Sequence, residues 1–147
     1  MTNLLTDPTF KIYAICTIVL LVQLQFLSGY TGAMRGKHKS FSNPEDGKQP
    51  AETKPPDAEH PAVARVIRTH RNGIENVPSF WIIGLIALIA RANPMGIQVC
   101  CIVFTVARIL HMICQLKGLQ PWRSMMYGFG VLSTVGLIVL TGMALAA

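Results

Sequence analysis

Apolar stretches separated by short polar connections organise this chain. Four of these stretches carry few or no charged residues, and they cover residues 12–34, 76–90, 95–116 and 124–147. A helix rises about 1.5 Å per residue, so about 20 residues cross the roughly 30 Å hydrocarbon core of a bilayer. The pattern therefore predicts an all-α fold: an integral membrane four-helix bundle.

The second apolar stretch is too short to span a membrane alone. Residues 76–90 would cover only about 22 Å as a helix, so the helix has to begin among the charged residues before them. Charge at that depth is costly and usually faces a polar cavity or a partner. We therefore expect a buried polar site, and one domain over residues 1–147 with helices over about 9–35, 62–91, 95–117 and 122–146 and a loop over about 36–61.

Composition and charge support a membrane protein. Of the 147 residues, 51% are hydrophobic and 14% charged, and the formal net charge is +6. Most basic residues lie in the first and third connections, which the positive-inside rule places in the cytoplasm with both termini opposite. This rule explains the positive charge, so we expect no nucleic-acid partner. A bacterial inner membrane and the endoplasmic reticulum both fit the rule.

The cysteines show no pattern of a metal or disulfide site. Cys16, Cys100, Cys101 and Cys114 all lie in apolar stretches, without a CxxC motif or a histidine at ligand spacing. We interpret them as small buried hydrophobic residues.

Polar side chains share a face at the cytoplasmic end of three predicted helices. At 100° per residue, four residues of the second helix fall within a stripe about 80° wide, which a fifth residue borders. The second helix contributes Arg65, Arg68, Asn72 and Glu75, with Arg71 at the border; the third Arg108, His111 and Gln115; the fourth Arg123, Ser124 and Tyr127. His70 points elsewhere. The three sets would line one cavity.

The composition of this cavity indicates its ligand. Guanidinium groups bind carboxylates in a bidentate manner, and a single Glu can hold an ammonium group. The ligand is therefore small, with an amine and more than one carboxylate. If it carries a thiol, the guanidinium and hydroxyl donors would stabilise the thiolate and lower the thiol's pKa.

Each set also has a purely structural interpretation. Arg68, Arg71 and Glu75 would form an internal ion-pair network, Arg108 would snorkel to the interface, and Tyr127 would belong to an aromatic belt. The excess of Arg over Glu and the shared membrane depth of the three sets favour a ligand site.

Four blocks of residues follow the pattern of one membrane protein family. They are Arg35, Phe41-Ser-Asn-Pro-Glu-Asp46, Arg65-x-x-Arg68-x-His70-x-Asn72-x-x-Glu75-Asn76-x-Pro78, and Ala107-Arg108-x-x-His111 followed by Arg123-Ser124-x-x-Tyr127. On these blocks the chain resembles the MAPEG family, the membrane-associated proteins of eicosanoid and glutathione metabolism. It is most similar to the branch of microsomal glutathione transferases and microsomal prostaglandin E synthases.

The resemblance implies a homotrimer with glutathione at each subunit interface, open toward the cytoplasm. The residues that would bind glutathione are Arg68, His70, Arg71, Asn72, Glu75, His111 and Tyr127, with Arg35 from the neighbouring subunit. Arg108 and Gln115 join this set through the face that they share with His111; Gln115 stands where the family has Tyr. Arg123 and Ser124 would stabilise the thiolate. Asp46 matches an acid with a proposed role in proton handling.

The implied activity is that of a membrane glutathione transferase. The thiolate would attack a lipophilic electrophile or reduce a lipid hydroperoxide dissolved in the bilayer. Two alternatives remain: glutathione-dependent isomerisation of a prostaglandin endoperoxide, and a non-catalytic membrane protein that binds a lipid or a partner.

Overall fold

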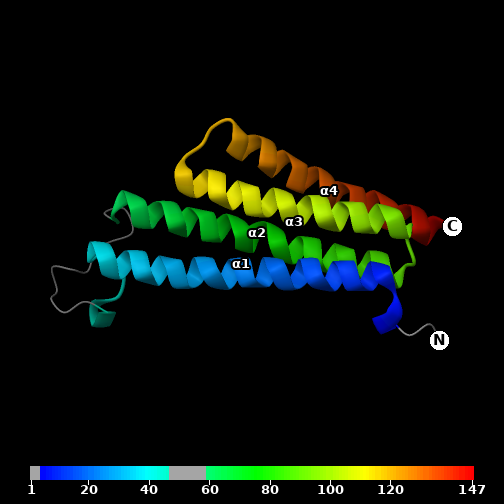
Figure 1. The fold of residues 1–147 in the computed structure, drawn as a ribbon, viewed down its shortest axis with the longest axis horizontal. Helices are drawn as coiled ribbons and strands as arrows, with labels where there is room; N and C mark the ends of the chain where they lie inside the picture. Colours follow the sequence, from blue (N-terminus) through cyan, green and yellow to red (C-terminus); the bar gives the residue numbers. More distant parts are fainter. Residues whose placement is uncertain (1–3, 47–58) are drawn as a thin grey trace.

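The four apolar stretches form four long helices that run up and down in a bundle (Figure 1). The computed structural model describes residues 4–46 and 59–147. The elements are η1 (Leu4–Thr6), α1 (Pro8–His38), η2 (Pro44–Asp46), α2 (Pro61–Ile89), α3 (Pro94–Lys117) and α4 (Trp122–Ala146), where η marks a short 3₁₀ helix. All four α-helices are long and apolar enough to cross a membrane. The predicted all-α membrane bundle is confirmed.

Three of the helices begin with the same local device. A proline opens each of α1, α2 and α3, directly after Asp7, His60 or Asn93, whose side chain accepts a hydrogen bond from a backbone N–H of the first turn. Proline suits the first helical turn because its missing N–H would have no partner there. At the other end of α3, Gly118 has φ +72°, the left-handed conformation that ends a helix and turns the chain toward α4.

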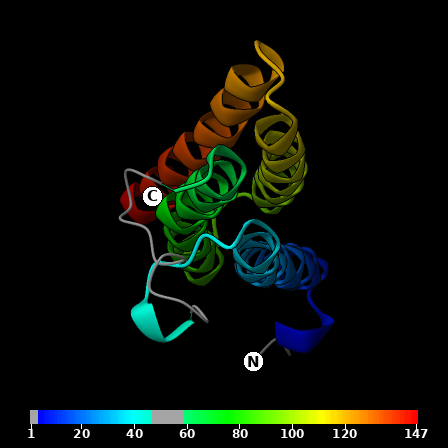
Figure 2. The same ribbon diagram turned by 90° about the vertical axis from the view of Figure 1, so that its left-hand side faces the viewer.

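α2 and α3 lie between α1 and α4 (Figures 1 and 2). The apolar core fills the half of the bundle near the chain ends. It includes the ring pair of Phe80 and Phe104, whose centroids are 3.9 Å apart with nearly parallel planes. Helix α2 approaches α1 closely at Gly84, where a Cβ would stand 2.8 Å from the ring of Tyr13. The helices near this end therefore pack tightly.

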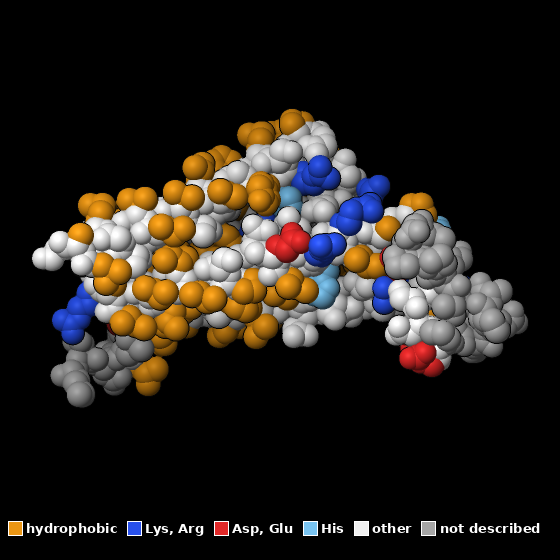
Figure 3. Space-filling view, turned by 180° about the vertical axis from the view of Figure 1, so that it is seen from behind, with side chains coloured by type: hydrophobic (Ala, Val, Ile, Leu, Met, Phe, Trp, Pro, Cys, Tyr) orange, Lys and Arg blue, Asp and Glu red, His pale blue; other side chains and the backbone are white. Residues whose placement is uncertain are grey.

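The outer surface divides along the length of the bundle. Seen from behind, hydrophobic side chains cover the half that carries the chain ends, and most Lys and Arg side chains gather toward the loop end (Figure 3). The four cysteines are free, two of them buried and two half-buried in the helices. The distribution of side chains in Figure 3 concentrates the basic groups that could bind a ligand at the loop end.

We expect Phe80→Ala to lower the free energy of unfolding by about 3 kcal/mol, because it removes a fully buried ring and leaves a cavity beside Phe104. Denaturation of the detergent-solubilised protein by sodium dodecyl sulfate measures the change. Ile82→Ala is the matched control, since that side chain is 62% exposed on the same helix. Equal effects of the two substitutions would contradict the assigned core.

Candidate functional site

A hollow of about 340 Å³ opens at the loop end between α2, α3 and α4. Its lining consists of Asn72, His111, Gln115, Arg123, Ser124 and Tyr127. The structure therefore brings six of the predicted site residues together, from all three helices on which the sequence placed them. The lining contains hydrogen-bond donors and one cation but no carboxylate, so the hollow suits an anionic ligand.

Arg108 lies behind this hollow and is almost completely buried, at 2% exposure. Its Nη2 donates to the side-chain Oδ1 of Asn72 at 2.6 Å and to the backbone oxygen of the same residue at 3.1 Å. Gln23 of α1 holds the backbone of Arg108, donating from Nε2 to its carbonyl oxygen at 3.2 Å. Arg108 thus orients Asn72 and links three helices.

The charge of Arg108 has no counter-ion in the described part of the chain. No carboxylate there forms an ion pair with it, and its Nε has no hydrogen-bond partner. A buried cation that is only hydrogen-bonded to neutral groups is unfavourable. A negative charge in the adjacent hollow would offset this cost.

His111 joins α3 to the start of α4. Its Nδ1 lies 2.9 Å from the backbone oxygen of Arg123. A carbonyl oxygen can only accept, so Nδ1 carries the hydrogen, and in the neutral ring Nε2 is an acceptor. The ring is 5% exposed and stands 5.9 Å from the ring of Tyr127. The hydrogen bond from Nδ1 fixes the backbone of Arg123 at the edge of the hollow.

One residue of the site escaped the sequence analysis. Gln120, in the turn before α4, lies within hydrogen-bond distance of Ser124, with 3.1 Å between Ser124 Oγ and the Gln120 amide. A glutamine before a proline carries no motif of its own. Helical spacing gives no signal either, because Gln120 lies in the turn before the first residue of α4 and its contacts depend on how that turn folds.

Five predicted residues on α2 do not line the hollow, and one of them, Arg65, lines a separate hollow beside the end of α1. Arg71 and Glu75 form an exposed ion pair, with Nε and Oε1 3.1 Å apart and side chains 80% and 55% accessible. Arg68 is also exposed, and His70 is half-buried. Within one chain they face outward, beside the hollow.

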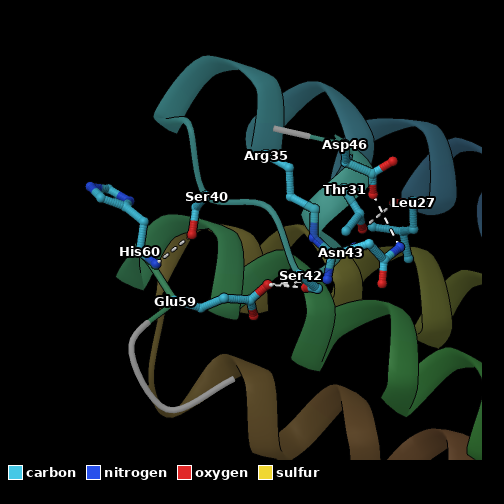
Figure 4. Close-up of polar contacts among 9 residues, drawn as sticks. All are labelled: Leu27, Thr31, Arg35, Ser40, Ser42, Asn43, Asp46, Glu59 and His60. Carbon is cyan, nitrogen blue, oxygen red and sulfur yellow. Dashed lines mark hydrogen bonds and ion pairs between the residues drawn. The ribbon is translucent and has the colours of Figure 1, made fainter. Parts of the chain in front are cut away.

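Arg35 and Asp46 lie on the other side of the bundle. Arg35 pairs through Nη2 with Oε1 of Glu59 at 3.1 Å, and Asp46 Oδ2 accepts from Asn43 Nδ2 at 3.1 Å (Figure 4). Both views of the ribbon show the end of α1 and η2 far from the beginning of α4. A single chain therefore does not bring these two residues to the hollow.

Comparison with known proteins identifies the family of this chain. The model of the MAPEG family matches residues 13–143. The chain belongs to the MAPEG family. Microsomal glutathione S-transferase 1 of Homo sapiens is 32% identical over 138 residues, which cover 89% of this chain and 88% of the relative. Prostaglandin E synthase of Homo sapiens is 29% identical over 129 residues, 84% of this chain and 81% of the relative, and the Bos taurus protein of that name is 27% identical over 126 residues, 85% and 82%.

This MAPEG protein is an integral membrane protein. Its four α-helices are each long and apolar enough to span a membrane, and its family is a family of membrane proteins. The hollow lies at the loop end of the bundle, and the apolar core lies toward the chain ends.

We expect Asn72→Leu to lower the free energy of unfolding by about 2 kcal/mol, because the buried Arg108 guanidinium loses its side-chain acceptor. Asn72→Asp should retain the stability of the unsubstituted protein or exceed it, since a carboxylate at that place also neutralises the charge. Denaturation in sodium dodecyl sulfate compares the two variants. Equal destabilisation by both would show that the contact with Arg108 contributes little.

Proposed function

We propose that this protein is a membrane-bound glutathione transferase that activates glutathione as a thiolate for attack on lipophilic electrophiles, including lipid hydroperoxides. The observation that carries the proposal is the composition of the hollow: it has donors and a cation in its lining, a second, buried cation behind it, and no carboxylate among its lining residues. Glutathione, with two carboxylates and a thiol, supplies negative charge to such a site. The 32% identity to a microsomal glutathione S-transferase supports the same substrate.

In the proposed mechanism Arg123 and Ser124 stabilise the sulfur as a thiolate. A guanidinium and a hydroxyl group that are already oriented stabilise charge without reorganisation in the reaction. The thiolate attacks the electrophilic atom, a bond to sulfur forms, and the leaving group departs with its electron pair. With a hydroperoxide, the thiolate sulfur attacks the outer oxygen, the O–O bond breaks and the alkoxide leaves and is protonated to the alcohol. The sulfenic acid left on sulfur then reacts with the thiol of a second glutathione, which forms the disulfide as water leaves.

The remaining residues would hold the peptide part of glutathione. Asn72, His111, Gln115 and Tyr127 line the hollow and offer donors and acceptors. Glu75 suits the ammonium group, and Arg71 suits a carboxylate. Since both reactants are held in one cleft at the membrane, proximity adds to the acceleration.

We further propose that the working form is a homotrimer in the membrane, with each site shared between neighbours. Arg35 is far from the hollow of its own chain, and the polar face of Arg68, Arg71 and Glu75 is uncovered. A neighbouring copy against this face would cover it and bring its own Arg35 to a carboxylate of glutathione. The site would then open to the cytoplasmic side, where positive loops lie.

A second candidate function is isomerisation of a lipid endoperoxide with glutathione returned unchanged. It is favoured by the 29% identity to a prostaglandin E synthase over 84% of the chain. Product analysis separates the two activities, because a conjugate retains the glutathione sulfur and an isomer does not. An absence of glutathione binding would instead favour the non-catalytic alternative.

We expect Arg123→Ala to lower the turnover number by about 100-fold, as for loss of one oriented donor, with a much smaller change in the Michaelis constant for glutathione. In the detergent-purified protein, the ultraviolet absorbance of the bound thiolate measures thiolate formation. The decay of this absorbance after addition of an activated aryl halide measures conjugation. Lys11→Ala, which removes an exposed cation at the opposite end of the bundle, is the control. Unchanged turnover in Arg123→Ala would refute the role of this residue.

Co-expression of Arg35→Ala and Arg123→Ala chains tests the shared site. Each variant alone should have little activity, and the mixture should regain part of it, because some interfaces then join an intact Arg35 to an intact Arg123. Tags of two kinds allow purification of the mixed oligomers before the assay. If the mixture is no more active than either variant, the two residues do not act across an interface.

A further inference from the structure

Gln120 contacts both residues that would stabilise the thiolate. It lies in the turn between α3 and α4, exposed and outside the lining of the hollow. Its side-chain amide stands 3.1 Å from the Oγ of Ser124 and, at its other end, 3.1 Å from the Nε of Arg123; the Nη2 of Arg123 also lies within hydrogen-bond distance. One neutral side chain thus spans the two groups.

The hydrogen-bonding capacity of these groups fixes which way the amide points. A guanidinium has only donors, so the group next to Arg123 has to be the amide oxygen. In that orientation the oxygen accepts from Nε and Nη2 of Arg123, and the amide nitrogen donates to Ser124 Oγ. The opposite orientation would place the amide nitrogen against two donors of Arg123.

This orientation determines what Ser124 can offer. Its Oγ accepts a hydrogen bond from Gln120, so its hydroxyl hydrogen is not needed for that contact and can be donated into the hollow. Arg123 likewise keeps its remaining N–H groups for the hollow, because Gln120 engages only two of its N–H-bearing atoms, from outside.

We infer that Gln120 is a positioning residue, whose amide holds the Arg123 guanidinium and directs the Ser124 hydroxyl hydrogen toward the glutathione sulfur. The inference rests on the proposed function and deepens it by assigning the residue that organises the thiolate-stabilising pair. A neutral amide suits this task better than a carboxylate. A carboxylate would accept from both residues, so it would turn the hydroxyl hydrogen of Ser124 away from the hollow and offset the charge of Arg123.

The test replaces Gln120 by two residues of similar size. Gln120→Glu should raise the apparent pKa of the bound glutathione thiol by about one unit and lower the turnover number about tenfold, with little change in the Michaelis constant for glutathione. Gln120→Met releases Arg123 but does not capture the Ser124 hydroxyl, so its effect should be smaller and in the same direction. The readouts are a pH titration of thiolate absorbance and steady-state kinetics of conjugation.

Lys117→Gln is the matched control for charge. This exposed residue at the end of α3 changes the turn by the same one unit as Gln120→Glu, and it makes no contact with Arg123 or Ser124 that the structure shows. The pKa of the glutathione thiol bound to Lys117→Gln should equal the pKa of the thiol bound to the unsubstituted protein. Thermal unfolding of all variants controls for loss of the fold.

A double-substitution cycle asks whether Gln120 acts through Ser124. Gln120→Glu should cost less turnover in a Ser124→Ala background than in the unsubstituted protein, since the hydroxyl that it would misdirect is already absent. Normal thiolate in both Gln120 variants, or equal shifts in Gln120→Glu and Lys117→Gln, would overturn the inference while the proposed function stands. If the unsubstituted protein forms no thiolate with glutathione, the proposed function fails and the inference with it.

Discussion

The structure depends on one buried cation. Arg108 sits inside an apolar bundle, and its described contacts are hydrogen bonds with Asn72 and, through its backbone, with Gln23. Removing a charge from water costs on the order of several kcal/mol even after the surroundings relax, and hydrogen bonds to neutral partners offset only part of this cost. The hydrogen bonds of this one arginine therefore connect three helices, α1, α2 and α3. The guanidinium has hydrogen-bond partners but no carboxylate partner in the described part of the chain, so a negative charge bound beside it would stabilise it.

The same cation marks the border between two halves with different tasks. Gly130 of α4 lies at this border: a Cβ there would meet the Arg108 stem at 3.5 Å and the Phe104 ring at 3.9 Å. On one side, the stacked rings of Phe80 and Phe104 and the other buried apolar side chains fill the space between the helices. On the other side, the helices carry donors that surround a hollow instead of filling it. Packing of apolar side chains in the first half stabilises the fold, so the second half can hold polar groups that lack some of their hydrogen-bond partners.

The sequence was sufficient for the helices, and the predicted set included all six residues that line the hollow. It also included residues that lie elsewhere, and it did not give the contacts of the site. Long uncharged stretches predict spanning helices because a bilayer tolerates little else. Periodicity gives the angle between two residues on one helix, but not which angle faces the neighbouring helix. That is why one stripe on α2 held both Asn72, which lines the hollow, and Arg68, which is exposed. The partnership of Arg35 with Glu59 and the contacts of Gln120 depend on how connections fold back, which no helical periodicity encodes.

The distribution of charge also separates the candidate functions. A neutral lipid in the hollow would leave the cost of burying Arg108 uncompensated, and it would take the donors of Arg123 and Ser124 out of water without replacing their hydrogen bonds. An anion relieves both penalties at once. A ligand whose charge is on sulfur would gain most from donors that are already held in place. The contacts of His111 with the backbone of Arg123 and of Gln120 with its guanidinium hold Arg123 in this way. Orientation of this kind adds little to the binding of a lipid, and it is what an enzyme that works on a thiolate requires.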